Sequence, residues 1–148
     1  MQIQVIEKDA NVFCVALAAR AVGLLGSGLR KDFAQLARSV VPSILEKFKE
    51  TKQTVVAALH EALERMHPHC FTLLDIIENI ETASDHKVPQ VKSEMLTFVI
   101  KCLKVSNRAA ISKQVKPFCN VFMKVLVASL IYVLCVLTAV SLRNVVDG

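Results

Sequence analysis

The feature that most restricts the fold is a repeating pattern of apolar residues between positions 33 and 48. These residues recur at spacings of three and four, which places them along one face of a four-turn helix: Phe33, Leu36, Ala37, Val40, Val41, Ile44, Leu45 and Phe48. Pro42 lies inside the segment, where a proline removes one backbone hydrogen bond and bends the helix axis. The pattern therefore predicts a bent amphipathic helix.

Similar patterns fill the rest of the chain. Four further stripes have helical spacing: Val55, Leu59, Ala62, Leu63 and Met66; Phe71, Leu74, Ile77 and Ile80, interleaved with Leu73 and Ile76; Leu96, Val99, Ile100 and Leu103; and Ile111, Val115, Phe118 and Phe122. Upstream, the segment from Val12 to Leu25 has one charge, Arg20, which predicts a helix buried nearly all round. No alternating pattern predicts a strand. The predicted fold is all-α.

The helices repeat in pairs. When Val12, Val55 and Val91 are set in register, apolar or small residues coincide at three later positions: Ala16, Leu59 and Met95; Ala19, Ala62 and Phe98; Gly23, Met66 and Cys102. The steps of 43 and 36 residues bracket the roughly 40-residue period of HEAT repeats. A short polar turn precedes each register valine. The sequence therefore predicts a HEAT-type solenoid, a row of stacked antiparallel helix pairs.

Composition narrows the class of partner. The chain has 148 residues, about one domain, and carries a net charge of +5, which favours an acidic partner. Its five cysteines lack a C-x-x-C pair and lie in or beside apolar runs, so we expect reduced core residues of a cytosolic protein. The first residues show no signal-peptide pattern.

Four segments resemble the TOG domain of the microtubule polymerase family. They are N-V-F-C-V-A-L-A-A-R-A-V-G-L-L-G-S-G-L-R-K-D-F (11–33), V-V-P-S-I-L-E-K-F-K-E-T-K-Q-T-V-V-A-A-L-H-E-A-L (40–63), D-H-K-V-P-Q-V-K (85–92) and K-Q-V-K-P-F-C (113–119). Together they cover roughly residues 3 to 124. The resemblance implies a HEAT-type paddle whose narrow edge of intra-repeat turns grips αβ-tubulin. It also implies action at microtubule plus ends, spindle poles and centrosomes, and a cytoplasmic, cytoskeletal location.

The resemblance also implies which residues touch tubulin. Three turns match the family's contact positions, and their residues are Asn11 and Val12, Lys52 and Gln53, and Lys87 with Lys92. Turns of stacked hairpins line up on one edge, and lysines there form a basic strip suited to an acidic surface. The segment K-F-K-E-T-K-Q (47–53) adds two more lysines to this strip. The alternative is that Lys52 and Lys87 are simply solvated turn residues.

The sequence departs from the family pattern at both ends. A TOG domain has about six repeats, whereas this chain begins inside the second and contains no tryptophan for the first turn. The pattern stops after Lys124, so we expect a partial domain at 1–124 and a divergent hydrophobic tail at 125–148. The stretch from Val125 to Leu142 has no charge and as a helix would span about 27 Å. Three interpretations of the tail are open. In decreasing order of preference, it is non-native sequence, a packed helix or a membrane anchor.

Other candidate sites are weaker. The motif H-P-H-C (67–70) lacks a second ligand pair at zinc spacing and is interpreted as an inter-repeat turn. The motif G-L-L-G-S-G (23–28) follows a helix and not a strand, so it predicts a helix end and not a phosphate loop. No nucleophile lies at helical spacing from His60 and Glu61, so these two residues do not predict a catalytic site.

We expect no enzyme, metal or cofactor. One tyrosine and no tryptophan offer little for bases to stack on, which argues against a nucleic-acid partner. The alternative function is a HEAT scaffold for another acidic protein.

Overall fold

The computed structural model describes residues 6, 11–67, 69–106, 118–119 and 121–127. Its elements are the α-helices α2 (Val12–Leu29), α3 (Ala34–Lys47), α4 (Gln53–Met66), α5 (Ile77–Ser84) and α6 (Pro89–Val105), with the 3-10 turns η1 (Arg30–Phe33) and η2 (Leu73–Ile76). The described parts of 118–127 are also helical. No strand occurs among these residues, so the all-α prediction is confirmed.

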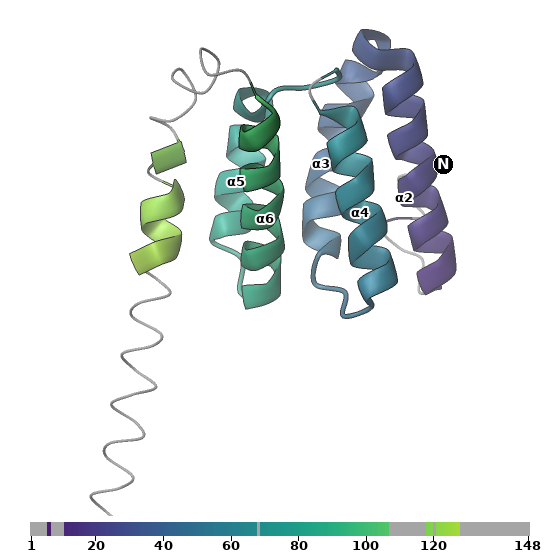
Figure 1. The fold of residues 1–148 in the computed structure, drawn as a ribbon. Helices are drawn as coiled ribbons and strands as arrows, with labels where there is room; N and C mark the ends of the chain where they lie inside the picture. Colours follow the sequence, from purple (N-terminus) through teal and green to yellow (C-terminus); the bar gives the residue numbers. More distant parts are fainter. Residues whose placement is uncertain (1–5, 7–10, 68, 107–117, 120, 128–148) are drawn as a thin grey trace, which may run out of the picture.

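The helices form two layers. In Figure 1, α2, α4 and α6 stand side by side in front, and α3 and α5 stand behind them. Consecutive helices α3 and α4, and α5 and α6, are antiparallel partners joined by short turns, so the predicted HEAT-type architecture is confirmed. The segment 40–63 is the end of α3, its turn and most of α4, as expected.

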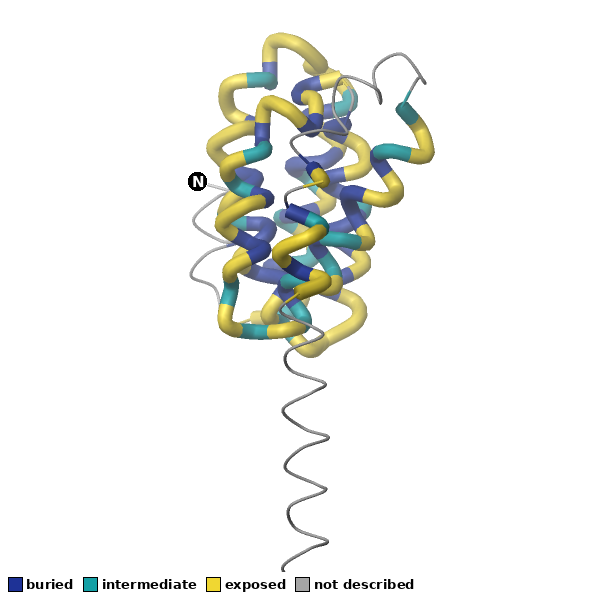
Figure 2. Tube along the Cα trace, turned by 90° about the vertical axis from the view of Figure 1, so that its left-hand side faces the viewer, coloured by how far each residue is buried: buried dark blue, intermediate teal, exposed yellow. Residues whose placement is uncertain are grey.

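The core lies between the two layers. In Figure 2 the buried residues line the interior of the helix row and the exposed ones face outward. Helix α4 is central to this core, because half of its residues are fully enclosed: Val55, Val56, Ala58, Leu59, Ala62, Leu63 and Met66. The largest enclosed side chains include three rings from different parts of the chain, Phe48, Phe71 and Phe98. The prediction that the 55–66 stripe faces inward is therefore confirmed.

The prediction that the 12–25 helix is buried nearly all round is wrong. Helix α2 stands at one end of the row, and only the side that contacts its neighbours is covered. Its outward face is apolar and exposed, with Phe13 at 83% and Leu17 at 70% of full exposure, followed by Leu24, Leu25 and Leu29. A low charge count therefore did not indicate burial, because position in the row decides which faces are covered.

Three stripe residues are also exposed and not buried. Leu36 in α3 and Ile100 in α6 are each 46% exposed. In the third stripe, Leu74 is exposed, while the interleaved Leu73 and Ile76 are enclosed. Of the last stripe, Phe118 is enclosed and Phe122 half-buried, and positions 111 and 115 lie outside the described residues.

Glycines let α2 approach α4 closely. A Cβ added to Gly23 would lie 2.8 Å from Cα of Ala62, and one added to Gly26 would lie 2.6 Å from Cγ of Met66. The motif G-L-L-G-S-G lies within the last two turns of α2, so its prediction as a helix end is confirmed. The chain then leaves the helix at Arg30, which has a φ of 51°.

The substitution Gly23→Ala is expected to destabilise the domain, with Gly28→Ala as its control. Nothing lies within 4 Å of a Cβ built at Gly28, so alanine there should raise the free energy of unfolding by up to about 1 kcal/mol through helix propensity. At Gly23 the same gain is opposed by overpacking against the α4 backbone, which costs about 1–3 kcal/mol. Urea unfolding of both variants measures the difference. Equal stability of the two would mean that α2 and α4 do not pack this closely.

The cysteines divide into two kinds, so the prediction that all are core residues is wrong. Cys70 and Cys102 are buried, whereas Cys14 and Cys119 are exposed, and all four are free thiols. Cys135 lies outside the described residues. Burial raises the pKa of the Cys102 thiol to about 12, which leaves almost no reactive thiolate at neutral pH.

We expect iodoacetamide to modify Cys14 and Cys119 in the folded protein within the time in which Cys102 stays unmodified. The physical reason is that the thiolate is the nucleophile: Cys14 and Cys119 are exposed to the reagent, whereas Cys102 is buried and its raised pKa suppresses the thiolate. Peptide mass spectrometry after brief labelling at neutral pH measures the three sites separately. Labelling in denaturant is the control, since all three should then react. Modification of Cys102 as fast as Cys14 in the folded protein would contradict its enclosure.

One helical stretch of the described residues, 12–47, is long and apolar enough to cross a membrane by length and composition alone. Core helices of soluble proteins pass the same test. The turn η1 divides this stretch into α2 and α3, and α2 packs along α4 through Gly23 and Gly26. In this structure the stretch is therefore part of the solenoid.

Candidate functional site

Three chain segments meet at one edge of the molecule. They are the α2 start (Asn11 and Val12), the α3–α4 turn (residues 48–52) and the α5–α6 turn (residues 85–88), and together they are called the turn edge here. In Figure 1 they lie along the lower end of the helix row, and the connections 30–33 and 67–72 lie at the opposite end. The expected alignment of the three turns is therefore present.

The three helices that leave this edge start in the same way. The residue before each first turn has an extended backbone, with φ and ψ of −81° and 110° at Asn11, −75° and 113° at Lys52, and −86° and 119° at Val88. Asn11 caps α2 through its side chain, which accepts a hydrogen bond of 3.0 Å from the N–H of Phe13. Pro89 occupies the first position of α6, where its missing N–H costs nothing. The three helices therefore begin with the same backbone geometry at the turn edge.

The predicted contact residues do not all have the same exposure. Asn11, Lys52 and Lys87 are exposed on the turn edge, and Gln53 is exposed beside it at the start of α4. Val12 and Lys92 are partly buried, and Val12 packs against the hydrophobic core. Lys92 lies in the first turn of α6, beyond the turn itself.

Two of the lysines expected in the basic strip already have acidic partners. Lys47 is 9% exposed and its Nζ lies 3.6 Å from Glu50, so it is not a surface charge. Lys49 donates to Glu46 at 2.8 Å, and this hydrogen bond is the largest factor that lowers the pKa of the Glu46 carboxyl. The prediction that Lys47 extends the strip is therefore wrong, whereas Lys49 is exposed on the turn edge with its charge paired to Glu46. Lys52, Lys87 and Lys92 form no ion pair with any described residue.

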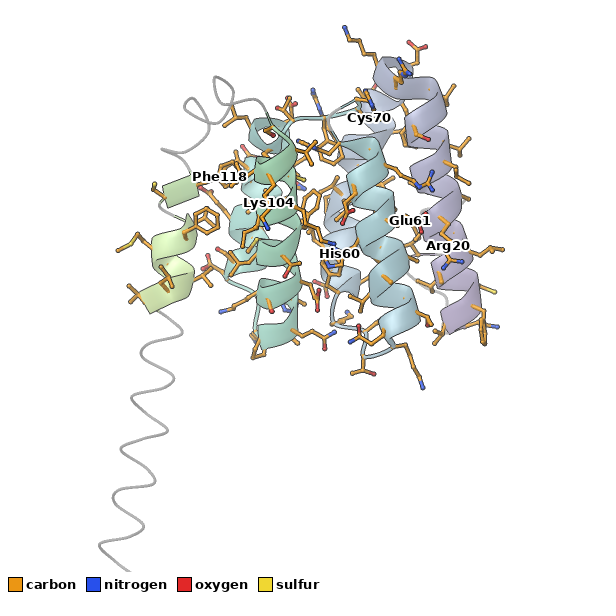
Figure 3. All side chains as sticks on the ribbon, in the orientation of Figure 1. Arg20, His60, Glu61, Cys70, Lys104 and Phe118 are labelled. Atoms are coloured by element: carbon orange, nitrogen blue, oxygen red, sulfur yellow. The ribbon has the colours of Figure 1, made fainter. Side chains whose placement is uncertain are left out.

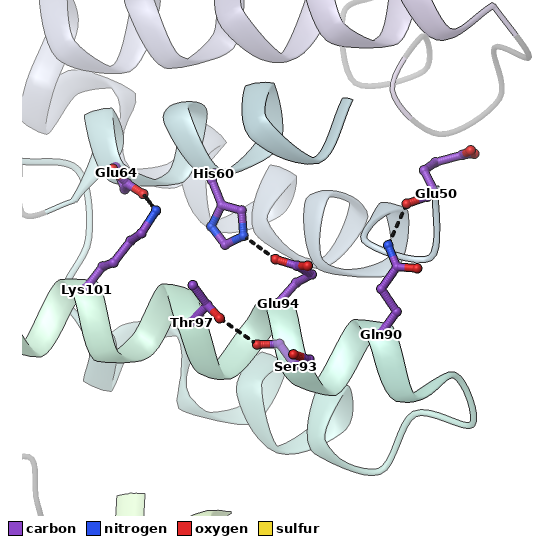
Figure 4. Close-up of polar contacts among 8 residues, drawn as sticks. All are labelled: Glu50, His60, Glu64, Gln90, Ser93, Glu94, Thr97 and Lys101. Carbon is purple, nitrogen blue, oxygen red and sulfur yellow. Dashed lines mark hydrogen bonds and ion pairs between the residues drawn. The ribbon is translucent and has the colours of Figure 1, made fainter. Parts of the chain in front are cut away.

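Two links between neighbouring turns were not predicted. The side-chain amide of Gln90 donates to the carbonyl oxygen of Glu50 at 2.6 Å, which joins the start of α6 to the α3–α4 turn (Figure 4). His86 Nε2 in the α5–α6 turn lies 3.1 Å from Oε2 of Glu46 at the end of α3. Neither residue stands out in the sequence, because a turn histidine and a polar residue in a first helical turn are both ordinary.

A buried histidine supports the α3–α4 turn from inside. The His60 ring on α4 stacks on Phe48, the residue after α3, with ring centroids 4.7 Å apart. Its Nε2 lies 2.8 Å from Glu94 of α6, and its buried Nδ1 has no hydrogen-bond partner among the residues that the structure describes. Figure 3 shows His60 between α4 and α6. It also shows Arg20 of α2 beside Glu61 of α4, where Arg20 Nε lies 3.6 Å from Glu61 Oε2.

A groove of about 670 Å³ between α4 and α6 includes His60, Glu64, Glu94 and Lys101 in its lining. The only hydroxyl residue of its lining, Thr97, uses its hydroxyl to bond the backbone carbonyl of Ser93. The chemistry of this lining is that of structural ion pairs, such as Lys101 with Glu64 at 2.7 Å. Among the described residues, no group of three or more His, Cys, Asp or Glu side chains could hold a metal ion. The motif H-P-H-C follows α4 as an inter-repeat connection, as predicted.

Known proteins resemble this chain in both sequence and structure. It is 40% identical over 119 residues to Protein MOR1 of Oryza sativa subsp. japonica. The aligned residues make up 80% of this chain and 6% of that protein. It is also 40% identical over 111 residues to Protein mini spindles of Drosophila melanogaster. Those residues make up 75% of this chain and 5% of that protein. The chain thus spans a small fraction of the relatives that it matches. No protein-family model matches it.

The fold comparison agrees with the sequence comparison. A chain in the solved structure "Structural Basis of Microtubule Plus End Tracking by XMAP215, CLIP-170 and EB1" superposes with a TM-score of 0.68 at 40% identity, covering 72% of this chain and 44% of that one. A chain in "Structural Basis of Tubulin Recruitment and Assembly by Microtubule Polymerases with Tumor Overexpressed Gene (TOG) Domain Arrays" gives 0.65 at 33% identity, covering 72% and 22%. With its paired helices and aligned turns, the chain belongs to the TOG-domain family of HEAT-repeat solenoids.

Proposed function

We propose that this chain binds αβ-tubulin through the turn edge and so supports microtubule polymerisation and spindle organisation in the cytoplasmic cytoskeleton. The observation that carries the proposal is the position of Lys52 and Lys87. Both are exposed on neighbouring turns of one edge, and neither forms an ion pair with a described residue. The named relatives and structures that concern spindles, plus ends and tubulin recruitment support it.

The contact residues are assigned by their place on this edge. Lys52 and Lys87 would supply the positive charge that meets an acidic surface, and Gln53 and Asn11 would supply hydrogen bonds beside them. Val12 would add apolar contact from its exposed part, and Lys92 would act from the flank of α6. Exposed charges of this kind contribute mainly to the rate and orientation of association. The chain acts by binding and not by catalysis, and needs no cofactor.

Gel filtration with free αβ-tubulin tests the proposal. The chain and tubulin should co-elute at low salt and separate as the salt concentration rises, because exposed charges are screened within about 8–10 Å at physiological ionic strength. Co-sedimentation with assembled microtubules is a second arm. A chain that stays apart from tubulin at every salt concentration in both assays would contradict the proposal. It would favour the alternative function, a HEAT scaffold for a different acidic protein.

We further propose that the functional domain comprises residues 1–124 and that residues 125–148 are a separate apolar tail. Residues 128–148 lie outside the described part of the structure. The membrane, packed-helix and non-native interpretations of Val125 to Leu142 make different predictions about a truncated chain.

Deleting residues 125–148 is expected to raise the solubility of the chain without unfolding it. An exposed apolar segment of this length promotes association, so its removal should leave more monomer after centrifugation and gel filtration. Circular dichroism of the truncated chain checks that its helices persist. Loss of the thermal transition on truncation would mean that the tail is part of the core, and extraction of the full chain only with detergent would identify a membrane anchor.

A further inference from the structure

The two working turns of the proposed interface are connected by side chains. Gln90 reaches from the first turn of α6 to the carbonyl oxygen of Glu50, two residues before Lys52 (Figure 4). His86, the neighbour of Lys87, reaches to Glu46 in the last turn of α3. Both contacts therefore join the α5–α6 turn or the start of α6 to the end of α3 or the α3–α4 turn.

The hydrogen bonds of His86 define its role. Its Nδ1 accepts a hydrogen bond of 3.0 Å from the N–H of Val88, so in the neutral ring the proton resides on Nε2. That Nε2–H points to Glu46 at 3.1 Å. One ring thus shapes its own turn through one nitrogen and contacts α3 through the other.

Helix packing holds the α2–α4 and α4–α6 junctions differently. Between α2 and α4, Gly23 and Gly26 allow direct contact of one helix with the other. Between α4 and α6 lies the groove of about 670 Å³, bridged by the side-chain pairs His60 with Glu94 and Lys101 with Glu64. On the side of α4 and α6, the two helices are therefore joined by side-chain contacts across the groove and not by direct helix contact of the kind seen between α2 and α4.

We propose that Gln90 and His86 are positioning residues that fix the spacing of the α3–α4 and α5–α6 turns. Lys52 and Lys87 are then presented together to one acidic surface, and Gln90 and His86 act on binding through the spacing of these two lysines. The binding consequence rests on the proposed function, but the spacing can be measured without tubulin.

Spin labels on both turns measure that spacing. Exposed Thr51 and Asp85 are changed to cysteine for labelling, with Cys14, Cys119 and Cys135 replaced by serine. Cys70 and Cys102 stay, because burial raises the pKa of both thiols and keeps them unlabelled. Double electron–electron resonance should give one narrow distance distribution in this parent protein.

Variants of His86 separate its two hydrogen bonds. Glutamine places its amide nitrogen where Nε2 lies, so His86→Gln keeps the contact to Glu46 and should keep the narrow distribution. Asparagine can accept from the N–H of Val88 but does not reach Glu46, so His86→Asn should broaden or shift the distribution. If His86 acted only within its own turn, His86→Asn would keep the narrow distribution and His86→Gln would broaden it.

Gln90→Met removes the donor at similar length without changing the charge, and it should broaden the distribution as His86→Asn does. Lys101→Met is the matched control, because it breaks a side-chain link between α6 and α4 at the end of both helices away from the turn edge, and it should leave the turn spacing unchanged. The double variant His86→Asn with Gln90→Met should show the largest effect. A distribution in that folded double variant equal to the parent's would overturn the proposal.

The binding arm distinguishes this proposal from the proposed function. In unlabelled protein the double variant should bind tubulin about tenfold more weakly, because contacts that are no longer held together lose effective concentration. If the parent itself does not bind tubulin while the spacing depends on Gln90 and His86, the proposed function fails and the positioning role stands. If the parent binds and the spacing does not change, the positioning role fails alone.

Discussion

Replacing Leu59 with alanine should lower the free energy of unfolding by about 2–5 kcal/mol. Leu59 is fully enclosed in the middle of α4, the helix that contacts α2, α3 and α6. Alanine leaves a cavity that three helices would have to fill by moving together, and their packing limits such movement. Chemical denaturation monitored by circular dichroism measures the change.

The control is the same substitution on an exposed face. Leu24 in α2 is 56% exposed, so Leu24→Ala should change stability by no more than about 0.5 kcal/mol. Equal stability of the two alanine variants would remove the assignment of the Leu59 face to the core. We also expect Leu59 to pack against Leu45 across the α3–α4 hairpin, because both are enclosed in the same core cluster, and equal stability would remove this expectation too.

Reversing Lys52 and Lys87 together to glutamate should weaken tubulin binding by more than about tenfold, whereas each single reversal costs about 1 kcal/mol or less. The difference is expected because two reversed charges on one edge face the same acidic surface. The fold should survive, since neither lysine forms an ion pair with a described residue. Titration of labelled tubulin at low salt measures the affinities, and raised salt should mimic the double variant.

The structure selects the control for this experiment. Lys101 is unsuitable because it bonds Glu64 at 2.7 Å, so its reversal would disturb the α4–α6 junction. Lys104 is exposed in the last turn of α6, at the end of the helix away from the turn edge (Figure 3). Lys104→Glu should leave most of the binding intact. If it weakens binding as much as the turn variants, net charge and not the turn edge determines the affinity.

The sequence predicted the helix pairs because each repeat has the same periodicity and the same turn. The repeat register identified buried faces better than the stripes did. Setting Val91 in register with Val55 selects Val91, Met95, Phe98 and Cys102, and all four are buried in α6. The stripe in the same helix included Ile100, which is exposed, because α6 carries more apolar residues than its neighbours cover.

Three features could not be predicted from the pattern. The outward face of α2 is apolar yet exposed, because coverage depends on which helices stand beside it. Lys47 and Lys49 are paired with nearby glutamates. A count of the charges along the sequence does not show where these side chains point. The contacts of His86 and Gln90 join residues 40 positions apart, so only the stacked structure brings their partners within reach.

Site-specific photo-crosslinking tests the central claim most directly. A photoreactive phenylalanine is placed at Thr51 or Asp85 on the turn edge, or at the exposed His69 in the connection at the opposite end of the row. With αβ-tubulin present, the account predicts covalent adducts from positions 51 and 85 and none from position 69. Adducts from position 69 with none from the turns would contradict it, because the turn edge would then not be the surface that meets tubulin.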